Sequence, residues 1–274
     1  MKKIFLLAII FLNLGRVCAL PVGNPSEARI FSDKPLGCDQ FVFSSDAVVW
    51  CIGYYGDYVF NRNLETDTHK KIDYSQMHTN AGYLALNCWD IFEVFTTLGV
   101  TKFRFNTSLK PFNGGNPSPR FEFESSTAFS WSVGARGVLF EYKSLSLGVE
   151  GQYFSTWPSA KRLFVRANVD AYPDESSQRK FSEWQVGAGI SYRYSFYFVP
   201  YIAIKYADVF WEFDNQTFSL TGTLATIPNL RNRKRVGYAI GATFAPFVCQ
   251  KIAVTVEGRF SDETAVYVNG HIYF

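Results

Sequence analysis

Single charged side chains recur inside stretches that otherwise hold small or apolar residues. In residues 184–194, one face carries Trp, Val, Ala, Ile and Tyr, and the other carries Gln, Gly, Ser and Arg193. Acids and bases placed singly along such segments can form ion pairs or sort ions and polar solutes by their field. Four acids and four bases are the candidates for such inward-facing charges, and together they predict a mixed and nearly neutral interior. They are Asp57, Glu93, Arg136, Glu150, Arg193, Lys205, Glu257 and Arg259.

The histidines give little support to catalysis. The chain has three, and His69, His78 and His271 stand in no recognisable nucleophile arrangement. The sequence contains no Cys-x-x-Cys spacing and no cluster of His residues, so it does not predict a metal site. We therefore expect no enzyme activity, no metal and no cofactor, and we interpret His271, between Tyr and Asn neighbours, as a hydrogen-bonded interior residue.

Residues 1–19 have the features of a secretory signal peptide. Lys2 and Lys3 precede an apolar run, and Val17-Cys18-Ala19 forms a small-residue cleavage site. Cleavage after Ala19 would remove three of the positive charges and bring the formal net charge from +3 to zero. The exported chain would then have no basic excess with which to bind nucleic acid.

Four cysteines follow this signal: Cys38, Cys51, Cys88 and Cys249. An exported chain enters an oxidising compartment, where disulfides form. Four cysteines allow three intrachain connectivities, and sequence cannot choose between them. Two internal bridges and bridges to other envelope proteins remain open alternatives.

Alternation with a period of two runs through most of the chain. The apolar face of each segment ends in aromatic residues, whereas the polar face is small and mixed, as in strands of an outer-membrane barrel. We expect residues 20–46 to form a segment on the periplasmic side or inside the lumen, and residues 47–274 to form the barrel. The predicted strands are 48–60, 77–86, 91–106, 125–139, 145–156, 183–195, 199–212, 235–246, 251–260 and 264–274.

The links between these strands alternate in length. Long links at one rim and short turns at the other are typical of outer-membrane barrels, and only 261–263 is short where a long link is expected. The last strand alternates up to a terminal aromatic residue, Phe274, which we interpret as the signal that the barrel-assembly machinery reads. The fold class predicted is therefore all-β: a single antiparallel transmembrane barrel with an even strand number, most simply ten to twelve and at most sixteen. Further strands could lie in 161–171 and 216–226.

Several sequence blocks resemble the chlamydial major outer membrane protein family. The blocks are collinear from residue 20 to the end of the chain, which is shorter than the major protein and looks like a shorter paralogue. The resemblance implies a cysteine-linked outer-membrane barrel that acts as a general porin and is often trimeric. The blocks that carry it are 20–25, 53–60, 85–90, 127–136 and 253–257.

The expected function is passive diffusion of small hydrophilic solutes or ions across the bacterial outer membrane. Ten to twelve strands fall between a filled barrel and a wide channel, so a largely closed barrel serving as a structural, disulfide-linked envelope protein or an adhesin is the alternative. Expected partners are outer-membrane lipid, lipopolysaccharide, the assembly machinery and a homotrimer or disulfide-linked envelope proteins. The basic run 231–235 could bind lipopolysaccharide phosphate or a host polyanion.

Overall fold

The computed structural model describes most of the barrel and a short N-terminal segment. In this part of the chain, no helix is long and apolar enough to span a bilayer. The structure is almost entirely strand, with one 3-10 turn, η1 (Glu27–Arg29). The residues described are 20–29, 48–66, 71–108, 120–166, 169–171, 179–195, 197–213, 217–220, 223–226, 229–247 and 252–274.

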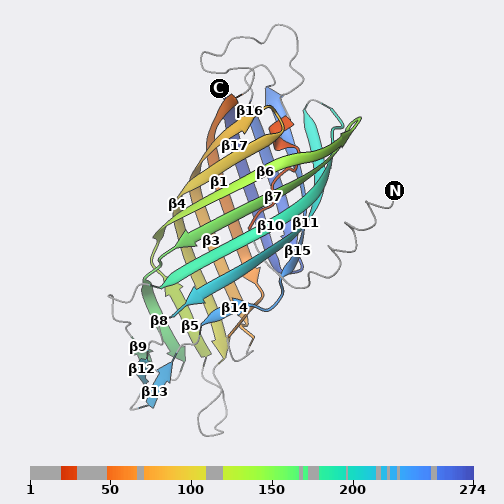
Figure 1. The fold of residues 1–274 in the computed structure, drawn as a ribbon. Coiled ribbons are helices and arrows are strands. Elements are labelled where there is room, and N and C mark those ends of the chain that lie inside the picture. Colours follow the sequence, from red (N-terminus) through yellow and green to blue (C-terminus); the bar gives the residue numbers. More distant parts are fainter. Residues whose placement is uncertain are drawn as a thin grey trace.

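Ten antiparallel strands form the wall in the described part of the chain (Figure 1). Each wall strand pairs with its chain neighbour, and β1 pairs with both β3 and the last strand, β17, which closes the ring. The sequence prediction of an antiparallel outer-membrane barrel is confirmed at ten strands. The wall consists of β1 (Val48–Arg62), β3 (Tyr74–Cys88), β4 (Phe92–Ser108), β6 (Ala128–Tyr142), β7 (Leu145–Thr156), β10 (Lys180–Tyr192), β11 (Phe198–Glu212), β15 (Val236–Phe247), β16 (Ile252–Phe260) and β17 (Glu263–Tyr273).

The strand faces follow the predicted alternation. On β10, Gln185 and Ser191 are buried inside the barrel, whereas Val186 and Ile190 are exposed on the outer surface. The outer surface is rich in large apolar side chains, as a lipid-facing wall requires. Aromatic residues are exposed near both rims, including Trp89 and Phe140 by the short turns and Phe129 by the long links.

Additional strands extend from the rim that carries the long links. In Figure 1 they gather at the end opposite the C-terminus. Residues 161–171 and 216–226 do contain strands, as the sequence allowed, but these pair outside the ring and leave the wall at ten. The additional strands are β2 (Leu64–Thr66), β5 (Arg120–Ser125), β8 (Ala160–Arg166), β9 (Val169–Ala171), β12 (Thr217–Leu220), β13 (Thr223–Thr226) and β14 (Leu230–Asn232).

Residues 20–29 lie inside the barrel. Leu20 packs in the same buried cluster as Val59 and Ala265, and Val22 packs with Ala203 and Ala239. Arg29 reaches Glu141, which stands near the short-turn rim at the end of β6. The segment therefore runs along the lumen, with Arg29 near that rim and Leu20 deeper in the barrel. Of the 20–46 segment expected from the sequence, residues 30–46 lie outside the described residues.

Candidate functional site: the barrel lumen

The structure brings the eight predicted luminal charges to the inside of the wall. Seven are buried, and Arg193 is half-buried beside the short-turn rim, where its Nη2 donates to the carbonyl of Arg29 at 2.6 Å. Alternation explains this placement, because each charge occupies the small polar face of its strand. The seven buried residues are Asp57, Glu93, Arg136, Glu150, Lys205, Glu257 and Arg259.

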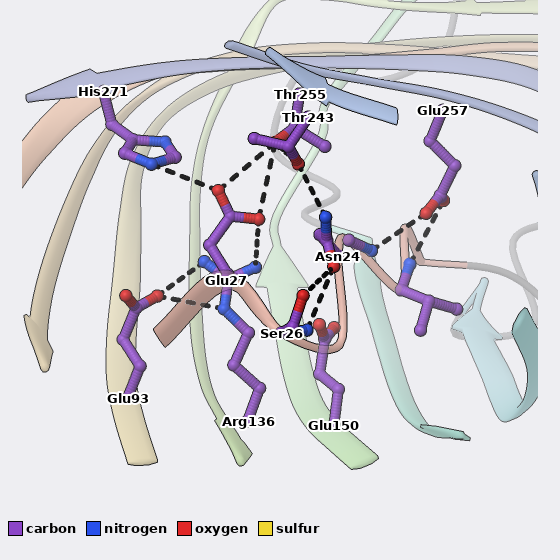
Figure 2. Close-up of polar contacts among 12 residues, drawn as sticks. Asn24, Ser26, Glu27, Glu93, Arg136, Glu150, Thr243, Thr255, Glu257 and His271 are labelled. Carbon is purple, nitrogen blue, oxygen red and sulfur yellow. Dashed lines mark hydrogen bonds and ion pairs between the residues drawn. The ribbon is translucent and has the colours of Figure 1, made fainter. Parts of the chain in front are cut away.

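A first group of charges surrounds Arg136, and we call it the Arg136 cluster: Glu27, Glu93, Arg136, Glu150 and His271. The Arg136 guanidinium donates to Glu93 Oε1 from Nε at 3.0 Å and from Nη2 at 2.5 Å. Its Nη1 lies 3.6 Å from Glu27 Oε2. Figure 2 shows the wall side chains of this cluster around the luminal segment, which itself carries Glu27.

Glu27 connects this cluster to the last two strands. Its Oε1 lies 3.1 Å from Nε2 of His271 and accepts a hydrogen bond from Thr255 at 3.2 Å. Burial raises the pKa of the Glu27 carboxyl, but the charge of Arg136 and the contacts with His271 and Thr255 outweigh burial and lower the pKa below its usual value. Glu27 is therefore held as a carboxylate inside the barrel.

A second group lies nearer the long-link rim, and we call it the Lys205 cluster: Asp57, Arg62, Glu183, Lys205, Arg259, Asp262 and Glu263. Glu263 joins its three bases, with ion pairs of 2.8 Å to Lys205, 3.0 Å to Arg62 and 2.9 Å to Arg259. Arg259 also pairs with Asp57, and Arg62 pairs with Glu183 at 3.0 Å. The cluster holds four acids and three bases.

The luminal segment is held largely by hydrogen bonds to its backbone. The Glu257 carboxylate accepts from the N–H groups of Val22 at 3.2 Å and Gly23 at 2.9 Å. Gln185 donates to the carbonyl of Pro21 at 2.7 Å, and Lys205 donates to that of Leu20 at 3.1 Å. Because a buried backbone group without a partner is costly, these four bonds fix the depth and register of the segment.

Glycines of the wall make room for the segment. A Cβ on Gly187 would stand 2.9 Å from Cγ1 of Val22, and one on Gly148 would stand 2.5 Å from the carbonyl oxygen of Pro25. The segment in turn has a glycine, Gly23, at φ +66°, a conformation that other residues rarely adopt. Wall and segment are thus complementary in shape.

Aromatic side chains fill the lumen toward the long-link rim. The rings of Phe103 and Trp211 are 4.9 Å apart, and those of Phe105 and Phe123 are also 4.9 Å apart. The guanidinium of Arg179 lies over the ring of Phe123 at 5.3 Å, and burial lowers the pKa of this arginine to about 10. The lumen therefore narrows to an apolar layer beyond the Lys205 cluster.

The interior is more acidic than the sequence predicted. Among the described residues, eight acidic side chains are buried against five of Arg and Lys, whereas the sequence predicted four of each. The sequence interpretation missed the charges at strand ends, in the turn and in the luminal segment. Glu183 could have been found, because it continues the polar face of its strand. The missed residues are Glu27, Arg62, Arg179, Glu183, Asp262 and Glu263.

Two of the four candidate disulfide cysteines are described, and both are free thiols. Cys51 is buried on the luminal face of β1, and Cys88, which is partly exposed, ends β3. The register sets Cys51 against Ala85, and the two cysteines face opposite sides of the wall. A Cys51–Cys88 bridge does not fit this arrangement, and Cys38 and Cys249 lie outside the described residues.

The remaining predicted positions are placed as follows. Phe274, the expected assembly signal, donates its backbone N–H to the carbonyl of Trp50 at 2.8 Å, and its side chain faces outward. His78 faces outward beside Tyr58, and His69 lies outside the described residues. In the part of the chain that the structure describes, no group of three His, Cys, Asp or Glu side chains is arranged to hold a metal ion.

A closed wall with an apolar outer surface and a charged interior defines an outer-membrane β-barrel. The chain belongs to the family described as the Chlamydia major outer membrane protein, which it matches over residues 1–77, 70–115 and 119–173. It is 28% identical to a major outer membrane porin of Chlamydia pneumoniae over 388 aligned positions, covering 100% of this chain and 99% of the relative. A major outer membrane porin of Chlamydia psittaci is 29% identical over 395 positions, covering 100% of both.

These alignments are longer than the 274 residues of this chain, so the relatives are longer, as the resemblance implied. The protein resides in the bacterial outer membrane. Among solved structures, the β domain of the Bordetella autotransporter BrkA matches with a TM-score of 0.46 and 10% identity, over 82% of this chain and 98% of that chain. The outer membrane protease OmpT of Escherichia coli matches with a TM-score of 0.42 and 12% identity, over 86% and 99%.

Proposed function

We propose that the protein is an outer-membrane porin that passes small ions and small hydrophilic solutes and prefers cations. The observation that carries this proposal is a closed barrel that, without Glu27 of the luminal segment, holds seven buried acidic side chains against five bases among the described residues. Fixed charges lining a narrow passage select permeating ions by their field, and an acidic excess favours cations. The curated relatives are named porins, and the proposal assigns the chain no enzymatic step.

Conduction requires residues 20–29 to shift from the position described. The segment lies among the wall charges, and its hydrogen bonds to Glu257, Gln185 and Lys205 occupy the groups that a solute would meet. An aromatic layer that includes Phe103 and Trp211 adds an apolar constriction, which opposes wetting. The proposed pore-lining residues are the eight charges predicted from the sequence, joined by Glu183, Asp262 and Glu263.

The decisive experiment is single-channel conductance of the refolded mature chain in planar bilayers, with and without reductant. A chain that starts at residue 30 serves as the matched variant. We expect rare conducting steps for the mature chain, frequent steps for the shortened chain, and a reversal potential in a KCl gradient that shows cation preference. A shortened barrel that folds and never conducts would contradict the porin proposal.

The filled lumen favours one alternative, a structural envelope barrel linked to other proteins through disulfides. In that case the shortened chain would remain silent, and cross-linked species would appear on gels run without reductant. Partners proposed on either reading are outer-membrane lipid, lipopolysaccharide, the barrel-assembly machinery and further copies of the chain. Mass analysis in detergent distinguishes a homotrimer from a monomer.

A further inference from the structure

The deepest described residue of the luminal segment is also the residue that would begin the chain after export. Leu20 is 1% exposed, and the expected signal-peptide cleavage falls between Ala19 and Leu20. Hydrolysis of that peptide bond by a signal peptidase consumes one water. The C–N bond breaks, the Ala19 carbonyl carbon takes the water oxygen and becomes a carboxylate, and the Leu20 nitrogen takes both protons of the water and becomes an ammonium.

We propose that the lumen is the binding site for this new amino terminus, and that the Leu20 ammonium is captured beside Lys205, Asp262 and Glu263. The proposal depends on removal of residues 1–19, and it is independent of whether the barrel conducts. Capture of an N-terminal amine by a site within a protein is a known mode of peptide recognition. Here the peptide and its site belong to the same chain.

The backbone contacts place the amino terminus at the Lys205 cluster. The carbonyl oxygen of Leu20 is 3.1 Å from Nζ of Lys205, and that Nζ is 3.4 Å from Asp262 and 2.8 Å from Glu263. Standard bond lengths keep the nitrogen of a residue within about 4 Å of its own carbonyl oxygen. The new ammonium is therefore formed within about 7 Å of Lys205 Nζ, which itself pairs with both buried carboxylates.

The charge balance of the Lys205 cluster leaves room for one more cation. Its four acids face three bases, so at full ionisation the cluster has a formal excess of one negative charge among the described residues. Neither carboxylate oxygen of Asp262 has a hydrogen-bond partner among these residues, although its side chain is fully buried. A buried charge without adequate pairing is costly. An added ammonium would make the cluster neutral.

The titration of Asp262 agrees with this balance. Burial raises the pKa of its carboxyl above the usual value, despite the opposing charge of Lys205. A second cation nearby would stabilise the ionised form.

The wall is also shaped for the peptide that follows the ammonium. Gly187 stands where a Cβ would meet Val22, and Gly148 stands where a Cβ would meet Pro25. Glycine inside a strand lowers strand stability relative to alanine, so a glycine at such a position indicates a close approach. The Glu257 carboxylate, which accepts from the next two backbone N–H groups, completes a site made for an extended N-terminal peptide.

Amine labelling tests the capture on the unaltered protein. The folded barrel, exported with its own signal and purified in detergent, is treated with formaldehyde and cyanoborohydride and then mapped by mass spectrometry. Exposed Lys143 is the reactive control, and buried Lys205 is the protected control. We expect the N-terminal peptide to begin at Leu20 and its amine to label at least about tenfold more slowly than Lys143, with equal labelling after denaturation.

A Leu20 amine that labels as fast as Lys143 in the folded barrel, or a first peptide that begins elsewhere, overturns the proposal. Charge capture is then separated from simple burial by a two-by-two comparison. Chains beginning at Leu20 are refolded with a free or an acetylated α-amine, each with and without Asp262→Asn. Selective acetylation is practical near neutral pH because an α-amine has a pKa of about 7.7–8.0, well below that of lysine.

We expect acetylation to lower the unfolding midpoint of the chain that has Asp262 and to change little in Asp262→Asn, where the excess charge is already gone. An equal effect of acetylation in both backgrounds, or no effect in either, contradicts the ion pair. If Asp262→Asn does not refold, the labelling experiment on the unaltered barrel still decides whether the amine is captured. Neither readout depends on conductance, so failure here is distinct from failure of the porin proposal.

Discussion

Glu27 Oε1 lies 3.1 Å from Nε2 of His271, so the luminal segment is tied to the last strand of the barrel inside the wall. These residues are 244 positions apart in a 274-residue chain. Thr255, on the strand before, donates to the same carboxylate. The segment can therefore make these contacts only in the closed barrel, because its partners come together only when the final strands are in place.

Replacing Glu27 by Gln should loosen the segment. The change removes the negative charge that Arg136 and His271 face, while the barrel wall keeps its own pairs. We expect faster hydrogen exchange of the Val22 and Gly23 amides and more frequent conducting steps. Glu141→Gln is the control, because its pair with Arg29 is partly exposed and such pairs contribute only about 0–1 kcal/mol. Equal exchange in both variants would argue against an anchoring role for Glu27.

Acid should release the same contact. The pKa of Glu27 is lower in the folded barrel than its ordinary value of 4.5, so its stabilising contribution is fully present above pH 4.5 and is lost as the pH falls through the folded value. We expect exchange of the Val22 and Gly23 amides, corrected for intrinsic rates, to rise only below about pH 4.5. In Glu27→Gln this rise should be absent. A rise centred near pH 6 would instead indicate that protonation of a histidine, and not of Glu27, releases the segment.

Gly187→Ala should displace the segment and spare the wall. The added Cβ would stand 2.9 Å from Val22, whereas its nearest wall atom, the carbonyl oxygen of Ile204, is at 3.6 Å. Overpacking of this kind costs about 1–3 kcal/mol, and here it should weaken the packing of the segment against the wall. Gly151→Ala is the matched control, since its Cβ makes ordinary contacts at 3.8 Å or more.

We expect faster amide exchange in residues 20–29 for Gly187→Ala and no change for Gly151→Ala, with similar unfolding midpoints for both. A lower midpoint with unchanged exchange in Gly187→Ala would mean that the wall, and not the segment, absorbs the added methyl group.

Arg259→Met should destabilise the barrel strongly. Arg259 is fully buried between Asp57 and Glu263, and removing one partner of a buried pair leaves uncompensated charge, typically at a cost of about 3–5 kcal/mol. Lys102→Met is the control, because Lys102 pairs with Glu124 on the exposed outer face. Unfolding in urea should show a large shift of the midpoint for the first variant and a small one for the second. Comparable midpoint shifts in the two variants would contradict a stabilising role for the buried ion pairs of Arg259.

The wall was predictable because its physical pattern is local. A period of two reveals which face a residue occupies, so Gln185, Glu257 and Arg259 were placed inside from sequence alone. The position of Glu27 was not predictable in the same way. Its partners, Arg136 and His271, come from strands that meet only in the closed ring, and no periodicity in residues 20–29 indicates a depth within the lumen.

The two described cysteines should react differently with a thiol reagent. Cys51 is 0% exposed on the luminal side of β1, and Cys88 is partly exposed on the other face of the wall. We expect iodoacetamide to alkylate Cys88 in the folded, reduced barrel and to reach Cys51 only after unfolding, as followed by peptide mass mapping. The shortened chain that starts at residue 30 supplies a further comparison: if the luminal segment shields Cys51, its alkylation should accelerate there while that of Cys88 stays constant. Rapid alkylation of Cys51 in the intact folded barrel would show instead that water and reagent pass freely along the lumen, and it would place the segment outside.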